Sequence, residues 1–80
     1  MSFSRDGALA ASKRLLRTFA SAPDQRRHAR MIYSELAGVE GWTGSERKDI
    51  DALGAWLQGL PSIGDLKPRC AQVVAKLGGA

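Results

Sequence analysis

Four stretches of the chain carry apolar residues at helical spacing, and glycine or proline residues separate each stretch from the next. They cover residues 5–20, 22–37, 44–58 and 66–77, and in each the apolar residues recur three and four positions apart, as on one face of a helix. Valine, isoleucine and threonine, which favour strands, are sparse. Since 80 residues suffice for one domain, the pattern predicts a single all-α domain over residues 1–80, a compact bundle of about four short helices.

Two of the helix starts carry clear capping signals. Ser4 precedes the first stretch and is a suitable N-cap, because its hydroxyl can accept a hydrogen bond from a free backbone N–H. Thr43 and Glu46 have the spacing of a capping box at the third. Within that third helix, Arg47 and Asp51 are four residues apart, so we expect them to form an ion pair.

The other two starts combine a cap with a proline. We expect Ser21 to cap the second helix, with Pro23 in its first turn and Asp24 as the capping-box acid, and Gly38 to end it in a left-handed conformation. For the fourth helix we expect Asp65 as N-cap and Pro68 in the first turn.

Between the third and fourth helices, the turn at residues 59–64 contains Leu60 and Ile63. Both side chains are large and apolar, so we expect them to close one end of the bundle.

Positive charge is concentrated in the first part of the chain. Residues 1–30 hold seven basic and two acidic residues, whereas residues 31–80 hold five basic and six acidic ones. Six of the basic side chains are predicted to line one face of each of the first two helices: Lys13, Arg14, Arg17, Arg26, Arg27 and Arg30. If these helices form a hairpin, the two faces could merge into one patch that binds an acidic protein surface or phosphates. The alternative is that they are solvated faces that keep the protein dissolved.

Trp42 lies in a glycine-rich loop at residues 38–44. An exposed tryptophan beside arginines is typical of an interface hot spot or of a platform on which bases stack. The alternative is that the ring folds back and seals the end of the bundle.

Residues for chemistry are few, because the chain has one histidine, His28, and one cysteine, Cys70. No third residue orients them as a catalytic pair, and Cys70 lies within an apolar stripe. A structural zinc site needs four such ligands, and no phosphate-loop motif is present. We therefore expect neither an enzyme nor a protein with a metal or other cofactor.

The sequence shows no apolar run long enough to span a membrane and no apolar core of a secretory signal. A free cysteine fits a reducing compartment. We therefore expect a cytoplasmic protein with no membrane contact.

These observations favour a small non-enzymatic protein-interaction module, an inhibitor or regulator that binds and blocks a larger, nucleic-acid-handling complex. Anti-defence proteins of phages and mobile elements, including anti-CRISPR-like inhibitors, have this size and general class. The alternative is a regulator that binds nucleic acid directly through the arginines of the first two helices. A third hypothesis is a homodimer whose basic face is only solvated.

Overall fold

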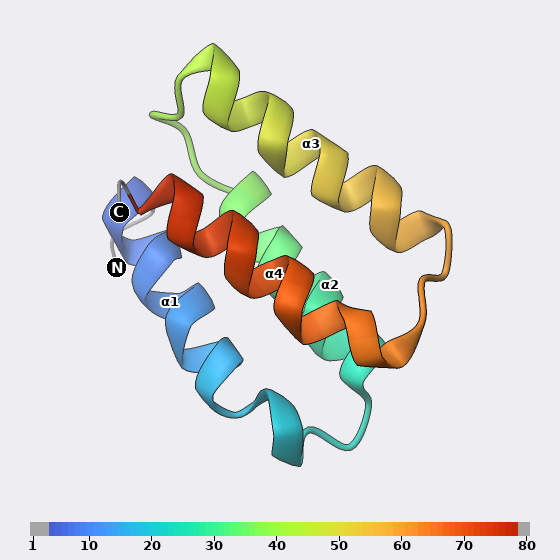
Figure 1. Ribbon diagram of the computed structural model, residues 1–80. Helices are drawn as coiled ribbons and strands as arrows, with labels where there is room; N and C mark the ends of the chain where they lie inside the picture. Colours follow the sequence, from blue (N-terminus) through green and yellow to red (C-terminus); the bar gives the residue numbers. More distant parts are fainter. Residues whose placement is uncertain (1–3, 79–80) are drawn as a thin grey trace.

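The computed structural model describes residues 4–78, which form four α-helices (Figure 1). They are α1 (Arg5–Arg17), α2 (Gln25–Ala37), α3 (Gly44–Gln58) and α4 (Ile63–Leu77), and a short 3₁₀ turn, η1 (Phe19–Ser21), follows α1. The predicted all-α bundle is therefore confirmed.

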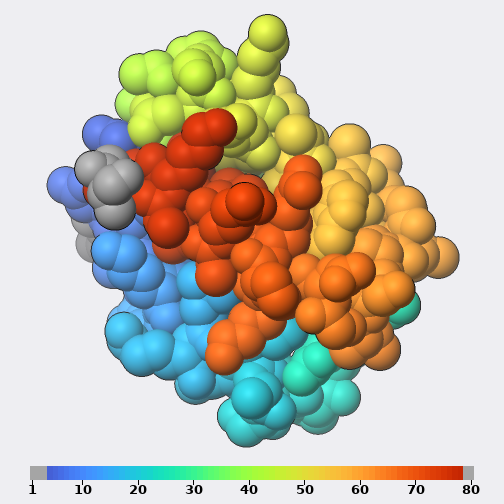
Figure 2. All heavy atoms as spheres, in the orientation of Figure 1, coloured from blue at the N-terminus to red at the C-terminus, as the bar shows by residue number. Residues whose placement is uncertain are grey.

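Helices α2 and α4 are central to the bundle, because each of them packs against the other three helices. Helices α1 and α2 form one hairpin and α3 and α4 a second, and α4 crosses in front of α2 (Figure 1). In the space-filling view α4 covers the face between α1 and α3 (Figure 2). Each helix thus has an inner side against its neighbours and an outer side in solvent.

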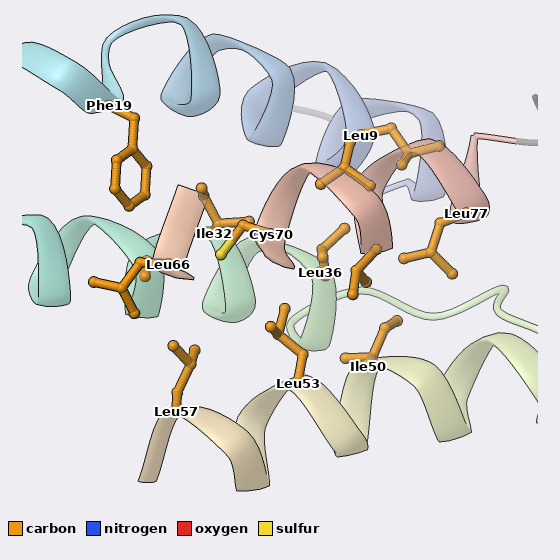
Figure 3. Close-up of a cluster of buried hydrophobic side chains, with 13 residues drawn as sticks. Leu9, Phe19, Ile32, Leu36, Ile50, Leu53, Leu57, Leu66, Cys70 and Leu77 are labelled. Carbon is orange, nitrogen blue, oxygen red and sulfur yellow. The ribbon is translucent and has the colours of Figure 1, made fainter. Parts of the chain in front are cut away.

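The core follows the apolar stripes expected from the sequence (Figure 3). Its fully buried large side chains come from η1 and from α2, α3 and α4, and they include Phe19, Ile32, Leu36, Ile50, Leu53, Leu66 and Leu77. Burial of these side chains is the main force that holds the four short helices together.

The two clear caps form as predicted. The hydroxyl of Ser4 accepts a hydrogen bond from the Gly7 N–H at 3.1 Å. Thr43 and Glu46 form a complete capping box, in which each side chain accepts from the backbone N–H of the other residue.

The start and the end of α2 differ from the prediction. Asp24 itself is the N-cap and accepts from the Arg27 N–H at 3.1 Å, whereas Ser21 closes η1. Proline disfavours helical geometry in the residue before it, and Ala22 is extended, so α2 cannot begin before Pro23. Gly38 has a φ of −81°, not the left-handed value expected. Its lack of a side chain allows close approach instead, since a Cβ there would lie 3.0 Å from the Ser34 carbonyl oxygen.

Helix α4 begins at Ile63, earlier than predicted, with Ser62 in the N-cap position. Asp65 is then an acid of the first turn, where the helix dipole favours it, and not the cap. Pro68 falls beyond the first turn and removes one backbone hydrogen bond from the helix.

Three side chains are placed differently from the predictions. Leu60 is 69% exposed and Ile63 is 52% exposed, so neither closes the end of the bundle. Leu60 lies in the turn after α3, and Ile63 is the first residue of α4. Arg47 reaches back to donate to the Ala37 carbonyl oxygen at 3.4 Å and does not pair with Asp51.

Candidate interaction surfaces

The predicted basic face of α1 is present and open to solvent. Lys13, Arg14 and Arg17 are all exposed, because the buried residues of α1, such as Ser12, occupy its other side. The ion pairs of residues 4–78 join Arg5 to Glu46 and Lys76 to Asp49. The three charges on α1 are therefore not neutralised by a carboxylate of the described chain.

His28 lies on the side of α2 that faces α1. Its Nε2 is 2.6 Å from the Leu15 carbonyl oxygen and 3.3 Å from the Thr18 hydroxyl, and its ring meets the edge of Phe19. The imidazole thus holds α1 and α2 together. Cys70 lies fully buried in the core, and burial raises the pKa of its thiol to about 11, so the sulfur is protonated at neutral pH.

Arg26 and Arg30 lie on the opposite side of α2 from His28. Each is two residues from His28, which places it about 160° away around the helix axis. The Arg26 Nη1 donates to the Pro61 carbonyl oxygen at 2.7 Å, in the turn between α3 and α4. Arg30 lines a groove between α2 and α3. The two arginines therefore face α3, away from α1.

The six predicted basic site residues are thus divided into separate places. Lys13, Arg14 and Arg17 lie on the outer face of α1, and Arg27 is exposed on α2. Arg30 lines the α2–α3 groove, and Arg26 lines a small hollow beside it at Pro61 and Leu66. The hairpin of α1 and α2 forms, but it does not merge all six side chains into one patch.

Trp42 is half-buried against the core. Its Nε1 donates to the Leu36 carbonyl oxygen at 2.8 Å, near the end of α2, and the Arg5 guanidinium lies 5.4 Å from the centre of its ring. This geometry corresponds to the sealing interpretation of Trp42.

The turn after α3 was predicted from the sequence, but its most unusual feature, the backbone conformation of Leu60, was not. Leu60 has a φ of 53°, a left-handed conformation that is normally occupied by glycine. The adjacent Gly59 has a φ of −76°, which any residue can adopt. The glycine stands one position before the left-handed residue. The segment Gly59-Leu60-Pro61 therefore predicts a turn, but it does not indicate that Leu60 is the left-handed residue.

Beside Leu60, the α2–α3 groove has a volume of about 340 Å³. Seven residues line it: Arg30, Tyr33, Ser34, Gly54, Leu57, Gln58 and Leu60. Gly54 makes the close approach of the tyrosine possible, because a Cβ at Gly54 would lie 2.6 Å from the Tyr33 Cε1. The groove is therefore built from a tyrosine of α2 placed directly on a glycine of α3.

Comparisons with known proteins give no match for this chain among family models, curated proteins or solved structures. In residues 4–78, no three His, Cys, Asp or Glu side chains stand close enough together to hold a metal ion. None of the described helices has the length and apolarity needed to cross a bilayer.

Proposed function

We propose that the protein is a non-enzymatic interaction module that binds an acidic surface of a larger protein or protein–nucleic acid complex. The observation that carries the proposal is the exposed, unneutralised cationic face formed by Lys13, Arg14 and Arg17 on α1. Such a face attracts acidic surfaces and speeds association with them.

The protein would act by covering a surface of its partner. A domain of 80 residues can cover a standard interface of about 800 Å² per partner. Binding would therefore block whatever surface it covers, which makes the protein an inhibitor or regulator. An anti-defence protein of a phage or mobile element, of anti-CRISPR type, is one inhibitor of this kind.

The test is affinity capture from the native host with the immobilised full chain. The key variant is the double charge reversal Arg14→Glu and Arg17→Glu. Its control is Lys48→Glu with Lys67→Glu, which makes the same change in net charge at exposed positions of α3 and α4. We expect a partner that the wild type and the control capture and the key variant does not. If no captured protein depends on Arg14 and Arg17, the proposal is wrong.

The alternative function, direct nucleic-acid binding, is favoured by the arginine content of the same face. The separation of the six basic side chains weighs against this alternative, because fewer of them can contact the phosphates of one nucleic acid that lies across α1 and α2. Fluorescence anisotropy of labelled oligonucleotides at about 50 and about 200 mM salt decides between them. Micromolar binding that falls steeply with salt supports the alternative, and no binding at the lower salt excludes it.

A further inference from the structure

Leucine at position 60 does not stabilise the fold. A leucine with a φ of 53° is sterically unfavourable, because its Cβ approaches the backbone, and glycine is the usual residue at this position after a helix. The side chain is also 69% exposed, so burial returns little of that cost. Strained residues that gain so little from packing are concentrated at binding sites.

The turn that carries Leu60 is held in place. The Leu60 N–H donates to the Leu57 carbonyl oxygen at 3.2 Å, and the next carbonyl, that of Pro61, accepts from Arg26 at 2.7 Å. A side chain on a fixed turn loses little conformational freedom when it is bound. The backbone that carries the exposed Leu60 side chain is thus held on both sides of the residue.

The charged residues that line the two hollows beside Leu60 are both basic. The lining of the α2–α3 groove, and of the small hollow beside it at Pro61 and Leu66, contains two charged residues, Arg26 and Arg30. Arg26 donates to a carbonyl, which leaves its charge unneutralised. Leu57 and Tyr33 supply the apolar part of the groove. An occupant that complements this lining has an apolar side chain flanked by carboxylates.

We propose that Leu60 and the α2–α3 groove form a docking site for an acidic segment of a partner protein that carries large apolar side chains. Leu60, Leu57 and Tyr33 contact the apolar side chains, and Arg30 pairs with the carboxylates. A volume of about 340 Å³ fits a few side chains, so the site takes a short segment and not a whole domain face. The inference rests on the proposed function in one respect, which is that the partner is a protein.

The experiment is an NMR titration of the ¹⁵N-labelled full chain with a synthetic amphipathic peptide that has leucines on one face and glutamates on the other. We expect shifts at the amides of Tyr33, Gly54 and Leu60, with a dissociation constant below about 1 mM. Two control peptides, with lysines for the glutamates or serines for the leucines, should not bind. No shift at these amides, or equal binding of the lysine peptide, would overturn the proposal.

Leu60→Gly separates binding from folding. Glycine tolerates the left-handed turn, so we expect a thermal midpoint that is unchanged or raised by up to roughly 4–8 °C, while peptide binding weakens by about tenfold or more. Arg30→Glu should weaken binding to a similar degree, and Lys48→Glu, its matched control on the outside of α3, should not. A Leu60→Gly variant with a clearly lowered midpoint would give Leu60 a structural role and refute the docking role.

Two further outcomes are distinguished by the same samples. If sedimentation shows a dimer that Leu60→Gly dissolves, the occupant is a second copy of this chain and the proposal of an acidic partner segment is wrong. Because the peptide titration needs no natural partner and leaves Arg14 and Arg17 unchanged, its failure rejects the groove alone. Failure of the capture experiment with the α1 variants rejects the proposed function instead.

Discussion

At the scale of single residues, Ser12 is a fully buried polar side chain whose replacement should stabilise the fold. It is fully buried on α1, and its hydroxyl has no hydrogen-bond partner among the described residues. Removing an unpaired buried hydroxyl removes its desolvation cost, so we expect Ser12→Ala to stabilise the fold by about 1 kcal/mol. This gain corresponds to a thermal midpoint roughly 4–8 °C higher in calorimetry.

The control for Ser12 is Ser34→Ala, at an exposed position of α2. We expect a change within about 0.5 kcal/mol there, as for most surface substitutions. Destabilisation by Ser12→Ala would mean that the hydroxyl has a partner after all.

Cys70 makes stability dependent on alkaline pH. Burial raises the pKa of its thiol from an ordinary value of 9.0 to about 11, so the folded state holds the proton more tightly than the unfolded chain does. The contribution of the protonated thiol to the free energy of unfolding is fully present below about pH 9 and is lost as the pH rises towards about 11. In Cys70→Ala we expect the urea midpoint to fall less steeply over this range than in the wild type. Equal slopes in the two proteins would contradict a buried, protonated thiol.

At the scale of helices, the contact between Gly54 of α3 and Tyr33 of α2 decides how closely the two helices pack. Alanine favours a helix over glycine by about 1 kcal/mol, but a Cβ at Gly54 would lie 2.6 Å from the Tyr33 ring. The ring must then move out of the groove. We expect overpacking to outweigh propensity, with a net loss of about 1–2 kcal/mol in urea denaturation.

Gly44→Ala is the matched control on the same helix, because nothing lies within 4 Å of a Cβ built there. We expect it to be neutral or to stabilise the fold by up to about 1 kcal/mol. If both alanine variants stabilise the protein, the tyrosine yields easily and the contact does not fix the spacing of the helices.

The helices themselves could be predicted from the sequence, because apolar spacing and the caps at Ser4 and Thr43 depend on neighbours within one turn. The beginnings of α2 and α4 were harder. In each case a proline near the start changes which residues can be helical, and Pro23 delays α2 whereas Pro68 is accommodated inside α4. The left-handed backbone of Leu60 could not be predicted, because it depends on the residue at which α3 ends. Leu60 follows Gly59, and the glycine was the expected left-handed residue.

At the scale of the whole molecule, contacts between distant residues decide which predicted site residues lie together. Helix geometry turns Arg26 away from α1, and its hydrogen bond to Pro61, 35 residues away in the chain, determines which neighbour it contacts instead. Arg5 shows the same effect more strongly. Its guanidinium pairs with Glu46 at 2.8 Å and donates to the Leu77 carbonyl oxygen at 3.2 Å, across 41 and 72 residues. No local pattern in the sequence carries this information.

The junction of Arg5 and Glu46 joins the start of α1 to the start of α3, and it should make the whole fold sensitive to acid. The pKa of Glu46 is lowered from its ordinary value of 4.5, mainly because its carboxylate accepts from the Thr43 backbone N–H, with further contributions from the Thr43 hydroxyl and from Arg5. A lowered pKa in the folded state means that the stabilisation is present above about pH 4.5 and is lost as the pH falls below it.

Glu46→Gln keeps the size of the side chain and removes the charge. We expect the variant to be less stable than the wild type at neutral pH, and the two to converge as the pH falls below about 4.5, in urea denaturation followed by circular dichroism. Glu35→Gln, at an exposed position of α2, serves as the control and should retain the acid dependence of the wild type. If Glu46→Gln keeps that dependence as well, acid sensitivity arises elsewhere, and the junction holds the helices through geometry and not through charge.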